Sequence, residues 1–288
     1  MTPPVTVVVA SFRAPELLSA CLDSLERARA PLDTPVVVAR QGGYHDVAHL
    51  ADGRPWLRWV AAAPDADVPH LRGIGMDAVE EGWAAVLEDH CVADPAWLTT
   101  LMEEAVESDD VLGGAMGNAR PGALNWGAFF SEYGFFTAGL EVAGVPLLTG
   151  ANVAYGPRVR AEVGRRARGG AWEDVIHTEL AHAGRSLRFV GAARVLQNDS
   201  YRFGAFCRDR YDHAVSYART RLTENPGTSR ALRIASAPLL PGVLTARVGR
   251  AALREHPLAF VRALPFTVAF LASWATGEAV GYLRGPTE

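Results

Sequence analysis

The sequence predicts an α/β protein with a mostly parallel sheet flanked by helices, followed by a C-terminal helical extension. Short β-branched runs alternate with segments of helical periodicity over residues 5–116. Polar side chains follow several of these runs, and 49% of the 288 residues are hydrophobic, enough for a sizeable core. Alternating strands and helices are typical of a doubly wound sheet, in which ligands bind beyond the carboxyl ends of the strands.

The expected strands are short apolar runs that suit parallel strands buried on both faces. They span residues 5–10, 35–39, 57–62, 84–87 and 111–116. Helices are expected between them. Residues 16–30 place Leu18, Leu22 and Leu25 on one face. Further helices are expected over 75–83 and over 95–107, where Pro95 stands in the first turn.

The C-terminal part differs in character, and we expect domains at 1–225 and 226–288. Residues 258–275 are apolar except for Arg262 and are interrupted by Pro265. Their length approaches that of a spanning helix, but the proline favours a re-entrant or surface-lying helix pair. Arginines precede the stretch and could meet anionic headgroups. The alternative is a soluble helical hairpin packed on the main domain.

Composition excludes several classes of function. The net charge of −4 argues against a nucleic-acid surface. All 28 basic residues are arginine, which excludes Schiff-base and P-loop lysine chemistry. Three widely spaced cysteines suggest neither disulfides nor a zinc site, and the N-terminus does not resemble a signal peptide. We therefore expect a cytoplasmic protein, with contact at the inner face of the cell membrane.

Glu88, Asp89 and His90 end the fourth expected strand. Oxygen and imidazole ligands suit Mn²⁺ or Mg²⁺ carried by a diphosphate, so this cluster is the candidate metal site. The alternative is an exposed acidic turn with a neutral histidine.

Two further clusters could carry chemistry. Trp172, Glu173 and Asp174 open a helix, where the dipole keeps carboxylates ionised as a general base requires. Simple helix capping is the alternative. Gly150 and Asn152 precede a short apolar run, where glycine permits close approach of a ligand and asparagine can bond a hydroxyl. An ordinary turn is the alternative there.

Five segments in this order resemble glycosyltransferase family 2, of the GT-A fold. They read VTVVVASFRAPELLSACLDSL, HLRGIGMDA, VLEDHCVADPAWL, LLTGANVAYGP and GGAWEDVIHTELAHAGRSLRFV. The resemblance covers about residues 5–220. It implies an inverting single displacement from a nucleotide-sugar donor to an acceptor hydroxyl, assisted by a divalent cation. The acceptor would be a glycan, a lipid-linked glycan or a small molecule.

The resemblance also implies roles for individual residues. His90 matches the usual metal ligand, with Asp89 beside it. Asp174 matches the catalytic base, with Glu173 as its rival, and Gly150, Asn152 and Trp172 lie where an acceptor would bind. The donor-binding positions are Ala10, Ser11, Phe12, Arg13, Arg40, Arg72, Glu88 and Asp89.

Several positions depart from the family pattern. His90 replaces an aspartate, and Arg13 replaces an asparagine. Arg40 stands where an acidic residue often reads the base, and it cannot accept a hydrogen bond. Gln197 or Asn198 stands in place of a downstream histidine. These departures leave the donor nucleotide unassigned.

Two other functions compete with sugar transfer. A catalytically silent GT-A module could bind a glycan or a protein partner, which the altered metal motif favours and the retained Glu173–Asp174 pair opposes. A sugar-nucleotide nucleotidyltransferase shares the topology, but it normally needs a glycine-rich first turn and a lysine. No G-x-G-x-x-G follows the first strand, which argues against a dinucleotide dehydrogenase.

Overall fold

The computed structural model describes residues 2–105, 109–137, 139–142, 144–224, 227 and 229–286. Contacts divide the chain into two compact units. Unit 1 comprises Met1–Gly117 and Ala138–Asn198, and unit 2 comprises Asn118–Thr137 and Asp199–Glu288. The domain boundary predicted between residues 225 and 226 lies outside the described residues.

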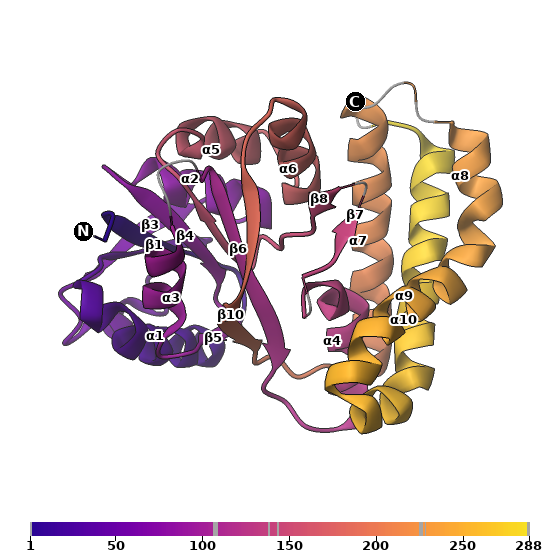
Figure 1. Cartoon of the computed structure of the whole chain (residues 1–288), viewed down its shortest axis with the longest axis horizontal. Coiled ribbons are helices and arrows are strands. Elements are labelled where there is room, and N and C mark those ends of the chain that lie inside the picture. The colour runs from indigo at the N-terminus through magenta and orange to yellow at the C-terminus, as the bar shows by residue number, and fades with distance from the viewer. Residues whose placement is uncertain are drawn as a thin grey trace. The chain divides into compact units, whose positions relative to one another are not determined.

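Unit 1 is built on an eight-stranded sheet flanked by helices (Figure 1). The strand order is β3-β2-β1-β4-β9-β6-β10-β5. The strands are β1 (Val5–Ser11), β2 (Val36–Gln41), β3 (Leu57–Ala62), β4 (Trp83–Glu88), β5 (Cys91–Ala93), β6 (Val111–Asn118), β9 (Asn152–Tyr155) and β10 (Leu187–Gln197). A short hairpin, β7 (Glu141–Val142) and β8 (Val145–Pro146), stands apart from this sheet.

The first four strands pair in parallel. Val9 of β1 lies opposite Val38 of β2 on one side and Leu87 of β4 on the other. Strands β1 and β4 are buried along their whole length, which explains their unbroken apolar sequences. The later strands differ in direction: β9 runs antiparallel to β4 and β6, and β10 to β5. The predicted α/β class is confirmed, with a mixed sheet.

The unit 1 helices are α1 (Pro15–Arg29), α2 (Val68–Asp77), α3 (Trp97–Glu104), α5 (Arg160–Arg168) and α6 (Glu173–His182), with short 3₁₀ turns at Ala30–Leu32 and Ala48–Ala51. The prediction of a helix over 75–83 is wrong. Helix α2 begins earlier because Asp67 caps it by accepting from the His70 amide at 2.9 Å. It ends before the turn at Gly82, whose φ of 72° favours glycine. The predicted helix end at Glu107 lies outside the described residues.

Unit 2 consists of helices α4 (Ala123–Glu132), α7 (Phe203–Glu224), α8 (Arg230–Ser236), α9 (Leu240–Glu255) and α10 (Pro257–Arg284), with 3₁₀ turns at Gly134–Phe136 and Ala237–Leu239. Helices α7 and α10 lie side by side (Figure 1). A Cβ on Gly277 or Gly281 of α10 would approach backbone oxygens of α7 to 2.3 and 2.6 Å, so glycine permits this close packing. Among the described helices, α10 alone is long and apolar enough to cross a membrane.

Candidate active site

Asp89 organises the turn that follows β1. Its carboxylate is fully buried, and Oδ2 accepts from Ser11 Oγ at 2.9 Å and from the amides of Phe12 and Arg13, each at 2.7 Å. Burial raises the pKa of Asp89, while His90 and these hydrogen bonds act in the opposite direction. The chain therefore holds the predicted donor-binding turn against the carboxyl end of β4.

Arg40 extends this arrangement from the end of β2. Its Nη1 donates to Ser11 Oγ at 3.0 Å and to the Arg13 carbonyl at 2.7 Å, and it lies 3.7 Å from Asp89 Oδ2. Its Nη2 donates to Asp46 at 3.0 Å. Parallel strands β1, β2 and β4 thus bring their polar ends together, as the sequence predicts.

Arg72 of α2 connects two acidic residues that are distant in sequence. Its Nη2 donates to Glu88 Oε1, and its Nη1 donates to Glu173 Oε2 at 2.6 Å. The Arg72 side chain is only 6% exposed. A Cβ on Gly150 would fall 2.1 Å from Arg72 Nη1, so glycine makes room for the guanidinium. We call Arg72, Glu88, Glu173 and Gly150 the Arg72 cluster.

The charges of this cluster stabilise one another. Burial alone would lower the pKa of Arg72, but Glu173 and Glu88 raise it above its ordinary value. Burial would likewise raise the pKa of Glu173, but the Arg72 guanidinium lowers it to about 2, helped by hydrogen bonds from backbone amides. Glu173 is therefore ionised and held in place at neutral pH.

The two carboxylates that open α6 have different surroundings. Glu173 uses both oxygens, since Oε1 accepts from the Gly150 amide at 3.1 Å and Oε2 accepts from Arg72. Asp174, the next residue, is exposed. The structure therefore brings Glu173 into the Arg72 cluster and leaves Asp174 accessible at the start of the same helix.

Glu88 and His90 are the candidate ligands for a cation. His90 Nδ1 lies 3.5 Å from Glu88 Oε2, and both side chains are buried. Asp89 Oδ1 is buried without a hydrogen-bond partner, whereas Oδ2 is engaged in the turn. Within the described ranges, no group of three or more His, Cys, Asp or Glu residues could hold a metal ion by itself.

The remaining predicted residues have mixed placements. Asn152 is fully buried, accepts from Trp97 Nε1 at 2.8 Å, and donates to the carbonyls of Ala115 and Ala193. An acceptor-binding role for Asn152 does not fit, because these bonds use both of its donors inside the sheet. Trp172 is half-buried directly before α6. Ala10 lies fully buried in β1.

Sequence reasoning missed a buried pair behind the Arg72 cluster. Tyr155 Oη and His177 Nε2 are 3.0 Å apart. Burial lowers the pKa of His177 to about 4, so the ring is neutral, and burial raises the pKa of Tyr155. The sequence gives one indication of this pair, which is that His177 stands one helical turn after Glu173.

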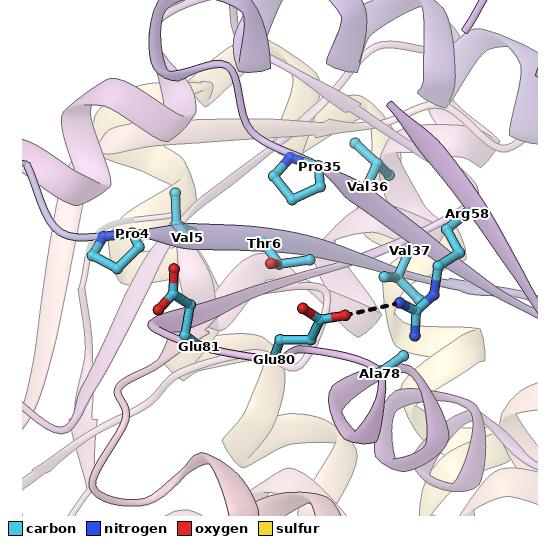
Figure 2. A pocket seen from close by; sticks show the side chains of 10 residues that line it. All are labelled: Pro4, Val5, Thr6, Pro35, Val36, Val37, Arg58, Ala78, Glu80 and Glu81. Atoms are coloured by element: carbon cyan, nitrogen blue, oxygen red, sulfur yellow. Dashed lines mark ion pairs between the residues drawn. The ribbon is translucent and has the colours of Figure 1, made fainter. Parts of the chain in front are cut away.

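A pocket of about 320 Å³ lies elsewhere in unit 1 (Figure 2). Its lining includes Val5 and Val36, which begin β1 and β2, and an ion pair between Arg58 and Glu80 at 3.6 Å. These residues lie at the opposite strand ends from Ser11 and Arg40, so this pocket does not belong to the candidate site.

Comparisons with known proteins come from structure alone. No family model matches the sequence, and no curated protein matches it. A mannosyltransferase from Pyrobaculum calidifontis, solved with GDP-Man and Mn²⁺, superposes with a TM-score of 0.58 at 14% identity, over 96% of this chain and 87% of that one. A 4-diphosphocytidyl-2C-methyl-D-erythritol synthase from Anaerococcus prevotii gives a TM-score of 0.46 at 9% identity, over 69% and 90%. The mannosyltransferase likeness extends over nearly the whole chain, and the chain accordingly has a GT-A-like fold with a C-terminal helical part.

Proposed function

We propose that this protein is an inverting glycosyltransferase of the family 2 type, which moves a sugar from a nucleoside-diphosphate donor to an acceptor hydroxyl. The observation that carries the proposal is the Arg72 cluster: a buried guanidinium lies at the carboxyl end of β4, between Glu88 and the start of α6. Nη1 and Nη2 each carry a second N–H beyond the one given to a carboxylate, and two such donors on one guanidinium are what a diphosphate requires. The GT-A-like fold supports the same assignment.

Ser11, Phe12, Arg13 and Arg40 are proposed to receive the nucleoside. Asp89 holds this turn in place through the Phe12 and Arg13 amides, so its role is to position the turn. Arg72 is proposed to bind the diphosphate and to stabilise the charge that develops as the bond to the sugar breaks.

A divalent cation fits the residues present. A cation that arrives with a diphosphate needs only one or two protein ligands, since phosphate oxygens and water supply the rest. Glu88 Oε2, His90 Nδ1 and the unbonded Asp89 Oδ1 are buried donors of the right chemistry. We propose Glu88 and His90, whose donor atoms lie 3.5 Å apart, as the two residues that would hold Mn²⁺ or Mg²⁺, with Asp89 beside them. When bound, such a cation would neutralise charge on the leaving diphosphate.

Asp174 is proposed as the general base and Glu173 as a positioning residue. A base needs an ionised oxygen that the acceptor hydroxyl can reach, and the exposed Asp174 carboxylate meets this condition at a helix N-terminus. Both Glu173 oxygens are already occupied. The acceptor oxygen attacks the anomeric carbon opposite the diphosphate, Asp174 takes the hydroxyl proton, and the diphosphate leaves with the bonding electron pair.

The acceptor is proposed to be an envelope or lipid-linked glycan, with the protein working in the cytoplasm at the inner face of the membrane. The apolar helix α10 supports the part of this proposal that concerns contact with a membrane.

The decisive experiment is an assay of sugar transfer and donor hydrolysis with GDP-mannose, with and without Mn²⁺. These are the natural first choices because the similar mannosyltransferase was solved with both. Wild type is compared with Asp174→Asn and with Asp52→Asn, a matched change at an exposed site. Turnover lost only in Asp174→Asn supports the proposal. Nucleotide binding without turnover under any donor and metal would instead assign a catalytically silent binding module.

A further inference from the structure

Among the described residues, the exposed large apolar side chains belong to one unit. Ten such residues are exposed among those the structure describes, and all ten belong to unit 2. They include Leu253 of α9, 51% exposed, and Leu258 and Val261 of α10, 72% and 62% exposed. Exposed apolar residues gathered in this way mark an interaction surface.

Three of these residues lie on either side of the junction between α9 and α10. Helix α9 ends at Glu255 and α10 begins at Pro257, so only His256 separates the two helices. Exposed Arg250 and Arg254 accompany Leu253 on α9, and exposed Arg262 accompanies Leu258 and Val261 on α10. We call these six residues the α9–α10 corner.

The charge of the corner is unbalanced. Residues 229–286 contain seven arginines and two glutamates, although the whole chain has a net charge of −4. One of these glutamates, Glu278, is buried and accepts from Trp274. Arg250, Arg254 and Arg262 form no ion pair with the described residues. Cationic heads therefore stand beside apolar side chains, and within residues 229–286 Glu255 is the remaining acidic residue.

The opposite face of α10 packs against other helices of unit 2. Phe260 and Phe270 are buried, and Gly277 and Gly281 pack against the backbone of α7. A helix held along one face cannot be surrounded by lipid, so its length alone does not make it a spanning segment. The apolar side chains that α10 leaves exposed include Leu258 and Val261 in its first turns.

We propose that the α9–α10 corner docks on an anionic lipid bilayer, with Leu253, Leu258 and Val261 entering the headgroup boundary and the three arginines pairing with lipid phosphates. This mixture of apolar and cationic side chains matches a bilayer surface, since arginine stems cover apolar surface while their heads remain among the phosphates. The contact is peripheral and reversible, and it does not depend on what unit 1 catalyses.

Vesicle co-sedimentation of the full chain tests this assignment. Wild type should bind phosphatidylcholine vesicles that contain phosphatidylglycerol, bind pure phosphatidylcholine weakly, and release as salt rises. The charge variant Arg250→Gln/Arg254→Gln/Arg262→Gln should lose about 100-fold in partitioning. The apolar variant Leu253→Gln/Leu258→Gln/Val261→Thr should lose at least about tenfold while keeping its preference for anionic lipid.

The matched control is Arg27→Gln/Arg58→Gln/Arg165→Gln, which removes the same charge from exposed sites on unit 1 and should bind like wild type. Circular dichroism checks that each variant folds, and Arg254→Gln/Arg262→Gln replaces the triple change if it does not. Equal binding by the charge variant and the control overturns the proposal. So does concentration-dependent dimerisation that the apolar variant abolishes without any binding to vesicles, because the corner would then contact a second copy of the chain.

Discussion

The guanidinium of Arg72 donates to the carboxylate of Glu173 at 2.6 Å, although the two residues are 101 positions apart. The bond joins α2 to the first residue of α6, and Arg72 reaches Glu88 at the end of β4 with its other nitrogen. Removing either partner leaves a buried charge incompletely paired, which is strongly unfavourable.

Glu173→Gln should therefore weaken donor binding more than it slows chemistry. Without the carboxylate, Arg72 loses one of its two anchors, so we expect an increase of about tenfold in the donor KM and a smaller change in kcat. The free energy of unfolding should fall by about 1–3 kcal/mol. Steady-state kinetics and urea denaturation measure both. A variant with unchanged KM but no turnover would make Glu173 the base.

Asp174→Asn should have the opposite kinetic signature. The substitution keeps the shape of the side chain and removes its basicity, so transfer should slow by about two to four orders of magnitude. Donor affinity should remain close to wild type, because the lost interaction belongs to the transition state. Single-turnover transfer and donor titration separate the two effects, and near-normal transfer would place the base elsewhere.

His90→Ala should reduce the metal dependence of nucleotide binding. If His90 helps to hold the cation, the affinity for GDP in Mn²⁺ should fall by about tenfold or more, and the difference from wild type should vanish in EDTA. A thermal-shift titration measures this, with the exposed His182→Ala as control. Identical titrations of His90→Ala and wild type in Mn²⁺ would remove His90 from the site.

His177 should make the stability of the fold depend on pH between about 4 and 6.5. Its pKa is about 4 when folded and about 6.5 when unfolded. The unfolded chain thus binds more protons between these values. The contribution of neutral His177 to the free energy of unfolding is therefore complete above pH 6.5 and is lost as pH falls toward 4. The loss amounts to about 3 kcal/mol at most. Thermal melts across this window measure the effect. The dependence of Tm on pH should flatten in His177→Gln but not in His182→Gln.

Gly281→Ala should destabilise unit 2. The added Cβ would lie 2.6 Å from the Val215 carbonyl of α7, so α7 and α10 must separate. A cost of about 1–3 kcal/mol is expected. Gly242→Ala in α9 is the control, because its Cβ meets nothing within 4 Å. Denaturant melts compare the two variants, and equal midpoints would contradict the close packing.

The sequence was most informative about features that depend on residues close together in the chain. Uninterrupted valines in β1 identify a strand buried on both faces. The Asp67 cap and Pro69 mark the start of α2, a signal that the predicted helix at 75–83 overlooked. Polar residues at strand ends located the turn held by Asp89, because parallel strands carry their ends to one edge.

Long-range pairings had no such signal. Nothing near Arg72 indicates that its partners are Glu88 and Glu173, since the sheet topology decides which elements meet. Asn152 resembles a ligand-binding residue in sequence, yet its amide is satisfied by three groups from distant elements. A pairing of this kind becomes visible only after folding.

Asp89 accepts hydrogen bonds from the amides of Phe12 and Arg13. These bonds affect the free energy with which any ligand binds to this turn. Fixing a backbone residue opposes association by about 1–2 kcal/mol of conformational entropy. Here folding has already fixed the turn, with Ser11 and Arg40 joined to the same carboxylate. A nucleotide that docks on this turn meets a rigid template, and its recognition can be driven by enthalpy, with little loss of protein motion.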